Sequence, residues 1–317
     1  MSSNIMKKNL LSVIVPLLNE EETICETYRR LESLRISLLN EAELEFIFID
    51  DGSQDRTFEI LSELAQGKLY FKVAALSRNF GHQIAITAGI DIACGDYVAI
   101  IDGDLQDPPE LIADMYRKAL LGFDVVYGKR KSRVGETFFK KITALGFYRF
   151  LNYMCEMEIP KDTGDFRLMS RNVVEAFKLM RERHRFVRGM VPWLGFRAVS
   201  LEYVRDKRFA GVTKYPLRKM IAFAANAIFS FSSKPLTLAI RIGLLTIAIG
   251  FGGGLYILYM KIFTNIPVPG LTAILLSIVL FSGVQIFLIG VVGEYIARIF
   301  EEVKNRPLYI LAKTINF

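Results

Sequence analysis

Two long apolar runs near the carboxyl end constrain this chain more than any other feature. Residues 242–260 form 19 positions without a charge, and residues 266–293 form 28. About 20 apolar residues are enough to cross the ~30 Å hydrocarbon core of a bilayer. Two buried core helices are the alternative, but two such runs so close together favour membrane spans. We expect the spans at about 238–260 and 270–293, because Pro267 and Pro269 suit a loop or a helix start.

The net charge of +7 is concentrated in the segment that precedes the first apolar run. Residues 197–241 carry nine basic and two acidic side chains, so the rest of the chain sums to zero. A solvated basic face and a nucleic-acid patch are the alternatives. A basic block beside a membrane span attracts anionic lipid by about 1 kcal/mol per charge, so we expect a membrane partner and no nucleic acid.

The charge pattern also predicts an orientation. The loop at about 261–270 carries one lysine, whereas the segment before the first span is strongly basic. The positive-inside rule therefore predicts a multi-pass protein of the cell inner (plasma) membrane, with the amino-terminal domain and the carboxyl-terminal tail in the cytoplasm. Three widely spaced cysteines, Cys25, Cys94 and Cys155, favour reduced thiols and agree with that compartment.

These boundaries divide the chain into four parts. We expect a globular domain over 1–212, a juxtamembrane amphipathic segment over 213–235, the two spans within 236–293, and a tail over 294–317. The tail and residues 217–231 combine charges with apolar side chains and suit the membrane surface. These amphipathic segments and the two spans suggest a homo-oligomer.

The globular part alternates apolar, β-branched runs with helix-like stretches. Strands that are apolar along their whole length, in repeated βα units, predict an α/β fold with a mostly parallel sheet covered on both faces. The runs are 11–18, 44–50, 71–77, 97–102 and 124–128. Ligands of such sheets bind beyond the carboxyl ends of the strands. Polar residues follow three of these ends, which predicts one shared crevice: Asn19-Glu20, Asp50-Asp51 and Asp102-Gly103-Asp104.

Asp102 and Asp104 lie two positions apart at a strand end, with Gly103 allowing a tight turn. Paired carboxylates suit Mg²⁺ or Mn²⁺ that also binds substrate phosphates. Two solvated turn carboxylates are the alternative for this motif alone. The continuation Leu-Gln-Asp-Pro-Pro-Glu makes the motif more specific, because Pro108 and Pro109 start a helix beside the site.

Six segments occur in a fixed order along the chain: VIVPLLNEE, IDDGSQDRT, SRNFGHQ, DGDLQDPPE, YGKR and DTGDFRL. Together they resemble glycosyltransferase family 2. The two apolar runs make the chain similar to the polyprenyl-phosphate branch of that family, which includes bactoprenol glucosyltransferases of the GtrB type and resembles dolichol-phosphate mannose synthase. The resemblance covers essentially the whole chain and implies a GT-A (Rossmann-like) fold.

The resemblance also implies roles for individual residues. Pro16, Asn19 and Glu20 would shape the nucleotide pocket, and Asp51 would hold the base or ribose. Arg130 would meet phosphate. The remaining sites would be a metal and diphosphate site at Asp102, Asp104 and Gln106, and a sugar and acceptor end at Asp162, Asp165 and Arg167. No role is assigned to His82, and a neutral structural imidazole is expected there.

The implied reaction is the inverting, metal-dependent transfer of a hexose to polyprenyl (undecaprenyl) phosphate. Glucose from UDP-glucose is the first choice of donor, with GDP-mannose and a modified arabinose as alternatives. The second pKa of the acceptor phosphate should be near 6, so a strong general base is not obviously needed. Asp162 and Asp165 are candidates for a base or for orienting the sugar, and one of them could instead cap the helix near Ser170 or hold Arg167.

Two rival classes remain at this point. A processive polysaccharide synthase usually has a Gln-x-x-Arg-Trp motif and more spans, whereas the comparable region here is RERHRFVRGMVPWLGF. A non-catalytic membrane scaffold that binds nucleotide-sugars, or a basic nucleic-acid binder, fits the acidic crevice poorly, because carboxylates repel nucleic acid when no metal is bound.

Overall fold

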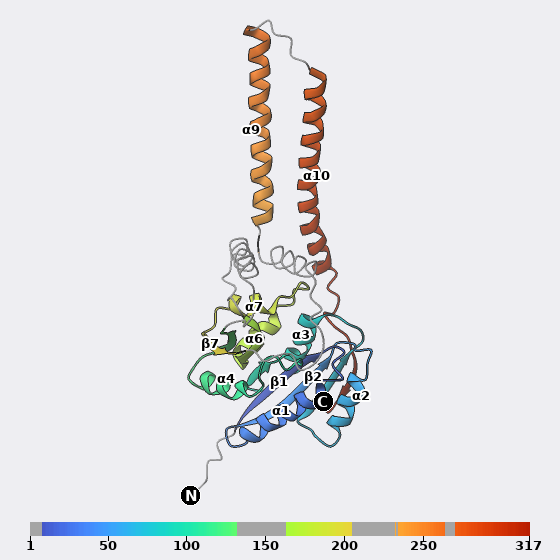
Figure 1. Ribbon diagram of the computed structural model, residues 1–317, viewed down its shortest axis with the longest axis vertical. Coiled ribbons are helices and arrows are strands. Elements are labelled where there is room, and N and C mark those ends of the chain that lie inside the picture. The colour runs from blue at the N-terminus through green and yellow to red at the C-terminus, as the bar shows by residue number, and fades with distance from the viewer. Residues whose placement is uncertain (1–7, 132–162, 205–231, 233, 264–269) are drawn as a thin grey trace. The chain divides into compact units, whose positions relative to one another are not determined.

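The computed structural model describes residues 8–131, 163–204, 232, 234–263 and 270–317, and it divides the chain into two compact units. The sheet unit contains the globular part together with residues 306–317, and the helical unit contains residues 217–305 with a short earlier segment. The strands, in Figure 1, are β1 (Asn9–Leu17), β2 (Ala42–Asp50), β3 (Phe71–Leu76), β4 (Tyr97–Ile100), β5 (Val125–Arg130), β6 (Thr163–Ser170), β7 (Ala198–Tyr203) and β8 (Leu311–Ile315). The helices are α1 (Ile24–Ser37), α2 (Thr57–Ala65), α3 (His82–Ile92), α4 (Leu111–Leu120), α6 (Arg171–Leu179), α7 (Val187–Trp193), α9 (Lys234–Phe263) and α10 (Gly270–Val303).

One mixed sheet organises the sheet unit, with the strand order β7-β5-β6-β4-β1-β2-β3-β8. Its centre, β4-β1-β2-β3, is parallel throughout. This part confirms the α/β fold that the apolar runs predicted, because each of these strands is buried on both faces.

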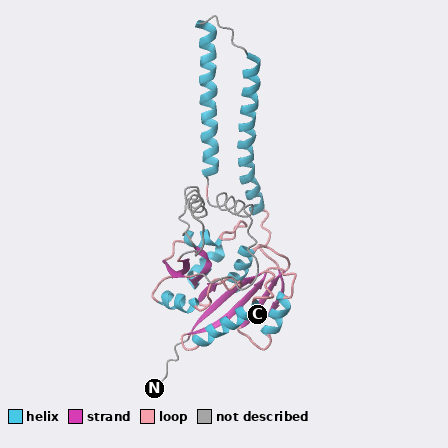
Figure 2. Ribbon diagram, in the orientation of Figure 1, coloured by secondary structure: helices cyan, strands magenta, loops and turns pink. Residues whose placement is uncertain are grey.

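Helices cover both faces of the sheet, as the ribbon in Figure 2 shows. Core residues of β1, β2 and β3 that point to one face pack with residues of α1, α2 and α4. On the other face α3 lies against β1, and its approach is close because a Cβ at Gly89 would come within 2.3 Å of Ile14 Cγ2. The amino-terminal end of α3 is thereby held at the carboxyl ends of the parallel strands.

The strand β6 was not predicted as part of the sheet. It lies between β4 and β5 and is antiparallel to both, so β5 does not simply continue the parallel series. Its side chains alternate between the two faces, with Phe166 and Leu168 in the core and Asp165 and Arg167 on the opposite face. The antiparallel strand therefore carries two charged side chains into the layer that contains α3.

The carboxyl terminus differs from the expected membrane-surface tail. The helix α10 continues to Val303, and residues 306–317 belong to the sheet unit. There β8 pairs antiparallel with β3, and Asn316 Nδ2 donates hydrogen bonds to the carbonyl oxygens of Ala65, Lys68 and Phe71. Residues 311–315 therefore cover an edge of the sheet, which protects the unpaired backbone groups of β3.

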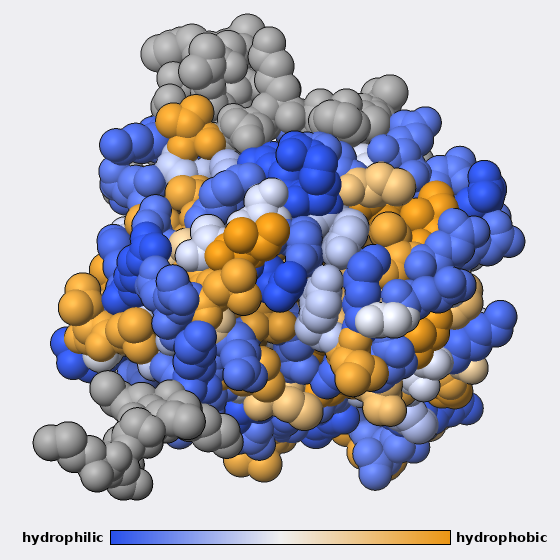
Figure 3. Space-filling view, turned by 90° about the horizontal axis from the view of Figure 1, so that it is seen from below, coloured by the Kyte–Doolittle hydropathy of each residue, from blue (hydrophilic) through white to orange (hydrophobic). Residues whose placement is uncertain are grey.

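The helical unit contains α9 and α10, whose surfaces are apolar. Both include stretches that are long and apolar enough to cross a membrane, Lys234–Met260 and Ser277–Val303. Large apolar side chains such as Leu244, Ile247 and Phe251 are more than half exposed. By contrast, hydrophilic residues predominate on the face of the sheet unit that Figure 3 shows, with hydrophobic ones scattered among them. The two helices indicate membrane association. The segment 217–231 lies outside the described residues.

Candidate active site

The polar residues after β1, β2 and β4 lie at one edge of the sheet. These three strands are adjacent and parallel, so their carboxyl ends point the same way. The amide of Asp51 donates to the Leu17 carbonyl oxygen at 2.9 Å, and the amide of Ile101 donates to that of Ile14 at 3.0 Å. The three strand ends therefore meet at one edge of the sheet, where the sequence pattern predicted them.

The loop after β1 is tied to the loop after β2. The amide of Asn19 donates to Ser53 Oγ at 2.9 Å, and Asn19 Oδ1 accepts from the Gln54 amide at 2.8 Å. The amide of Glu20 donates to Thr57 Oγ1 at 3.0 Å. Asn19 has a φ of 53°, a left-handed conformation that asparagine tolerates better than most residues. Asn19 thus shapes this rim through its backbone and its side chain, and Glu20 does so through its backbone. Pro16 lies buried in β1.

Asp51 holds a third loop. Its two carboxylate oxygens accept hydrogen bonds from the amides of Phe80 and Gly81, at 2.8 and 2.9 Å. Burial raises the pKa of Asp51, and these two hydrogen bonds oppose the rise. Gly52 beside it has a φ of 72°, and a Cβ there would lie 2.5 Å from the backbone carbon of Arg78. The pair Asp51-Gly52 therefore sets the position of residues 78–81, which lead into α3.

The Asp102–Gln106 loop follows β4 and is strained. Leu105 is buried and has a φ of 58°, a conformation that is unusual for a large side chain and that often marks functional loops. The amide of Gln106 donates to Asp104 Oδ1 at 3.2 Å. Burial raises the pKa of Asp102 to about 6, while the nearby His82 imidazole opposes the rise. Burial thus makes the charged form of this carboxylate unfavourable unless a cation lies beside it.

His82, the first residue of α3, lies between two carboxylates. Its Nε2 is 3.4 Å from Asp102 Oδ1 and 3.3 Å from Asp165 Oδ2. Burial alone would lower the pKa of His82, but the charge of Asp102 and the contact with Asp165 raise it to about 9. The expectation of a neutral structural imidazole is therefore wrong, because two acidic neighbours favour the imidazolium.

Asp165 on β6 is fully buried and surrounded by donors. Arg188 on α7 donates from Nε at 3.0 Å and from Nη2 at 2.9 Å, and Gln83 Nε2 donates at 3.2 Å. Burial would raise the pKa of Asp165, but Arg188 and His82 hold it well below its usual range. Such a carboxylate is a weak proton acceptor. Its geometry suits the positioning of His82 and Arg188.

Arg130 at the end of β5 contacts the Asp102–Gln106 loop region through Asp107. Its Nη2 lies 3.6 Å from Asp107 Oδ2, and its Nε donates to Tyr203 Oη at 3.3 Å. The Tyr203 hydroxyl donates in turn to Asp107 Oδ1. Burial opposes the charge of Arg130, but Asp107 and the Tyr203 hydroxyl together outweigh it and raise the pKa of the guanidinium. Arg130 therefore stays cationic next to the loop.

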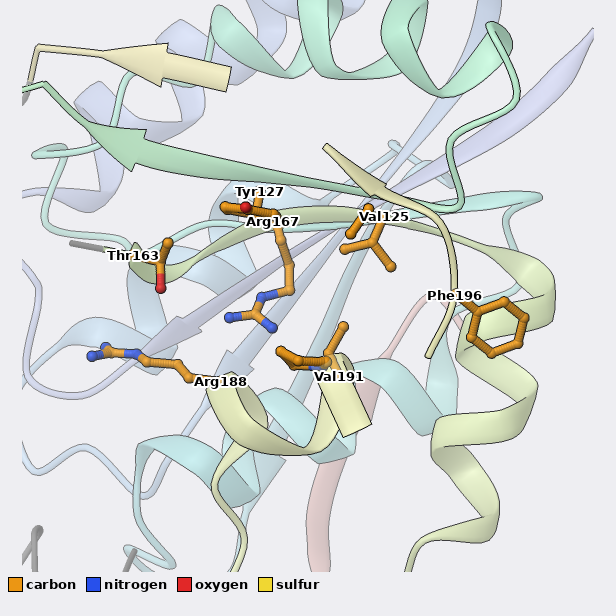
Figure 4. Close-up of a pocket in the computed structure, with 9 residues that line it drawn as sticks. Val125, Tyr127, Thr163, Arg167, Arg188, Val191 and Phe196 are labelled. Carbon is orange, nitrogen blue, oxygen red and sulfur yellow. The ribbon is translucent and has the colours of Figure 1, made fainter. Parts of the chain in front are cut away.

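Arg167 points into a pocket between the sheet and α7, as Figure 4 shows. Its guanidinium donates to the backbone carbonyl oxygens of Asp165, Val187 and Gly164. Burial lowers the pKa of Arg167 to about 10, which still leaves it charged at neutral pH. Arg188 lines the same pocket, so the pocket joins the cluster of His82, Asp102 and Asp165.

The residues at the strand ends fit a divalent cation. Asp102 Oδ1 is buried and has no hydrogen-bond partner among the described residues, apart from its ion-pair contact with His82. The described part of the chain holds no group of three or more His, Cys, Asp or Glu side chains that forms a metal site by itself. Mg²⁺ is commonly bound by one or two carboxylates together with substrate phosphates, so two aspartates are a sufficient protein contribution.

The structure thus brings most of the expected site residues to one region. Pro16, Asn19, Glu20, Asp51, Asp102, Asp104, Gln106 and Arg130 lie at the carboxyl edge of the sheet or next to it, and Asp165 and Arg167 lie on β6 beside it. Asp162 lies outside the described residues. Sequence reasoning missed Gln83 and Arg188. His82 and Gln83 belong to the motif SRNFGHQ, which could have marked them as site residues. Arg188 lies in a basic stretch that contains no motif to distinguish it from its neighbours.

Comparison with protein families and curated proteins gives a consistent result. The profile of Glycosyl transferase family 2 matches residues 12–177. A Bacillus subtilis (strain 168) protein named uncharacterized glycosyltransferase YkcC is 49% identical over 303 residues, which are 96% of this chain and 93% of that protein. The bactoprenol glucosyl transferase of Shigella phage SfII is 41% identical over 304 residues, which are 96% of this chain and 98% of that protein.

Solved structures give a more distant likeness. Glucosyl-3-phosphoglycerate synthase from Mycobacterium tuberculosis, crystallised with Mn²⁺, uridine diphosphate and glucosyl-3-phosphoglycerate, aligns with a TM-score of 0.43 and 23% identity. The alignment covers 70% of this chain and 78% of that one. A likeness of this degree says nothing about what the present chain binds.

Proposed function

The chain belongs to glycosyl transferase family 2, and from this premise we propose that it transfers a hexose from a nucleotide-sugar to polyprenyl phosphate at a membrane. Glucose from UDP-glucose is the proposed donor substrate, and undecaprenyl phosphate is the proposed acceptor. The name of the phage SfII relative, a bactoprenol glucosyl transferase that matches nearly the whole chain, supports this choice. The exposed apolar helices α9 and α10 support a lipid acceptor.

One observation carries the proposal: a buried, hydrogen-bond-deficient oxygen of Asp102 lies at the edge where three strand ends meet. In this proposal Asp102 and Asp104 hold Mg²⁺ or Mn²⁺, with Gln106 nearby. The bound metal would offset the charge of the diphosphate and stabilise it as a leaving group. Asn19, Glu20 and Pro16 form the rim for the nucleotide, and Asp51 keeps residues 78–81 in place beside it.

The remaining residues of the cluster position charges around the reacting sugar. The acceptor is a phosphate monoester that is largely ionised at neutral pH, so it attacks without first losing a proton. Asp165 is a positioning residue in this scheme, because its donors leave it a poor base. The cations His82, Arg130, Arg167 and Arg188 counter the two anions that approach one anomeric carbon. In-line attack of this kind inverts the anomeric centre.

The proposed setting is the inner membrane, with the sheet unit on the cytoplasmic side. Support comes from the charge pattern, since the segment before α9 is strongly basic and residues 261–270 carry one lysine. Cytoplasmic nucleotide-sugars and the lipid phosphate are then available on the same side.

The test is a donor screen with the full chain in detergent or lipid nanodiscs. UDP-glucose, GDP-mannose and UDP-linked aminoarabinose are each offered with undecaprenyl phosphate and Mn²⁺ or Mg²⁺, and lipid-linked sugar is measured by mass spectrometry. We expect glucosyl product from UDP-glucose, its loss in EDTA, and recovery on adding metal. Asp102→Asn should lower turnover by about 100-fold or more, whereas the surface variant Asp114→Asn should match the wild type. The proposal is contradicted if none of the three donors gives a lipid-linked sugar, or if turnover is undiminished in EDTA.

A further inference from the structure

The loop that carries Asp102 and Asp104 is held at its far end as well as at its start. At the start, Asp102 Oδ1 lies 3.4 Å from His82 Nε2 on α3. At the far end stands Asp107, directly before the two prolines that lead into α4, and its side chain is fully buried. Burying a charge is costly unless the charge is paired and hydrogen-bonded. The partners of Asp107 therefore help to fix the conformation of this loop.

Two partners of Asp107 come from the strands β5 and β7. The Tyr203 hydroxyl donates to Asp107 Oδ1, and Arg130 Nη2 lies 3.6 Å from Asp107 Oδ2. Arg130 Nε also donates to Tyr203 Oη at 3.3 Å, so the three side chains form a closed triangle of polar contacts. Arg130 and Tyr203 are direct neighbours in the β5–β7 ladder, which brings both to the same level of the sheet. We call Asp107, Arg130 and Tyr203 the Asp107 clamp.

Packing fixes the position of the Tyr203 ring. The ring lies edge-on against Phe166, with the ring centroids 5.8 Å apart, and both residues belong to the core of the sheet unit. A Cβ at Gly128 would lie 2.9 Å from Tyr203 Cε1, so a side chain there would collide with the ring. Burial and the charge of Asp107 raise the pKa of Tyr203, so the hydroxyl stays protonated and remains a donor. The sheet thus sets where the hydroxyl that holds Asp107 lies.

Gly164 on β6 leaves room for the third member of the clamp. A Cβ at Gly164 would lie 2.7 Å from Arg130 Nη2. Gly164 belongs to the segment DTGDFRL, Asp107 to DGDLQDPPE and Arg130 to YGKR. The clamp therefore brings together three segments that are far apart in the sequence.

We propose that the Asp107 clamp positions the Asp102–Gln106 loop for binding a divalent cation, and that Tyr203 is the positioning residue that holds the clamp together. The inference rests on the proposed function, because it takes Asp102 and Asp104 as the metal ligands. Tyr203 reaches the loop through Asp107, so it acts on these ligands indirectly. Replacing a residue that orients metal ligands in this way typically lowers metal affinity by about 10–100-fold. A tyrosine with a merely structural role would affect stability and leave metal affinity unchanged.

Removing a single hydroxyl tests the inference. Tyr203→Phe keeps the ring against Phe166 and removes the donor to Asp107. Tyr116→Phe is the matched control, because Tyr116 is also a buried tyrosine and its hydroxyl accepts from Asn9 Nδ2 at 3.0 Å, at the start of β1. The full chain in detergent is titrated with Mn²⁺, alone and with UDP, and free Mn²⁺ is followed by electron paramagnetic resonance. Thermal unfolding of each variant is measured in EDTA.

We expect Tyr203→Phe to raise the Kd for Mn²⁺ by about tenfold, and to raise the Mn²⁺ concentration for half-maximal turnover by the same factor. Turnover at saturating Mn²⁺ should stay within about threefold of the wild type, because the ligands themselves are intact. Tyr116→Phe should lose a similar amount of thermal stability and bind Mn²⁺ as the wild type does. Asp102→Asn should abolish the measured binding, which assigns that binding to this loop.

Gly164→Ala gives a second perturbation of the clamp. The new Cβ would displace the Arg130 guanidinium, the flexible end of a long side chain, and leave Asp107 and Tyr203 unchanged. We expect Gly164→Ala to weaken Mn²⁺ binding as well. Because contacts within one network are coupled, the double variant Tyr203→Phe/Gly164→Ala should bind Mn²⁺ little more weakly than Tyr203→Phe alone.

The inference is overturned if Tyr203→Phe binds Mn²⁺ as tightly as the wild type, or if Tyr116→Phe weakens binding equally. Fully additive effects of Tyr203→Phe and Gly164→Ala, or a wild type without Mn²⁺ binding that depends on Asp102, overturn it too. Failure of the proposed function looks different. In that case no donor sugar reaches polyprenyl phosphate, although Mn²⁺ still binds and Tyr203→Phe still weakens its binding.

Discussion

Arg188 donates two hydrogen bonds to the carboxylate of Asp165, from Nε at 3.0 Å and from Nη2 at 2.9 Å. The two residues lie 23 positions apart, on α7 and β6. The Asp165 side chain is fully buried, whereas that of Arg188 is 32% exposed. A bidentate pair of this kind fixes the guanidinium in one orientation, so Asp165 determines where the charge of Arg188 points.

Replacing Asp165 by Asn should therefore lower both stability and turnover. Asn keeps the shape of the side chain but removes the charge that Arg188 and His82 face, and breaking a buried pair costs about 3–5 kcal/mol. Chemical denaturation should show a loss near the lower end of that range, and turnover should fall about 100-fold. Asp114→Asn is the control, because its pair with Arg117 is solvent-exposed and contributes little. If Asp165→Asn lost all turnover at unchanged stability, a direct chemical role would be favoured over positioning.

Substitutions of His82 should separate charge from shape. His82→Lys keeps a cation beside Asp102 and Asp165, so we expect turnover within about threefold of the wild type. His82→Leu leaves two carboxylates facing each other and should lower turnover at least about tenfold. The remaining histidine, replaced in His184→Leu, is the control. Equal activity of the Lys and Leu variants would show that the positive charge at this position is unimportant.

Gly52 and Gly67 allow a matched test of crowding beside the nucleotide rim. Both have φ near 70°, but a Cβ at Gly52 would lie 2.5 Å from the Arg78 backbone, whereas a Cβ at Gly67 meets open space. Gly67→Ala should lower the free energy of unfolding only by the backbone strain, which is about 1–2 kcal/mol. Gly52→Ala must also displace residues 78–81, so we expect a larger loss of stability and a higher KM for the nucleotide-sugar. Thermal unfolding and donor titrations check this, and equal losses at the two positions would contradict it.

Glu45 should make the sheet unit sensitive to acid. Burial alone would raise its pKa, but hydrogen bonds from Lys72, Ser12 and the Cys94 amide lower it below its usual value of 4.5. A lowered folded-state pKa gives stability that is present above about pH 4.5 and lost as the pH falls through the lowered value.

The Glu45→Gln variant should therefore be less stable than the wild type at pH 7, and lose less stability between pH 6 and pH 3.5. Glu43→Gln, an exposed position on the same strand, should follow the wild-type profile. Melting temperatures across this pH range make the comparison, and parallel profiles for Glu45→Gln and wild type would refute the assignment.

The local patterns were enough to predict the parallel half of the sheet and its carboxyl edge. Strands such as 11–17 and 44–50 are apolar at most positions on both faces, which is the pattern of a sheet covered on both sides. The polar residues that follow them had to meet, because parallel neighbours end at the same edge. Two apolar runs of span length likewise predicted α9 and α10, because crossing a bilayer is a requirement on length and composition alone.

Tertiary structure decided the rest through contacts between residues that are distant in sequence. The local sequence of residues 163–170 and 311–315 does not predict an antiparallel strand, because their pairing partners are distant in the sequence. Residues 163–170 pair with β4 and β5, and residues 311–315 pair with β3. The cationic state of His82 depends on Asp102 and Asp165, which are 20 and 83 positions away. The sequence by itself determined the family of folds and the edge where chemistry occurs, since these follow from periodicity and strand direction. Only the folded chain could bring Arg188 to Asp165, because side-chain electrostatics depend on distances in space.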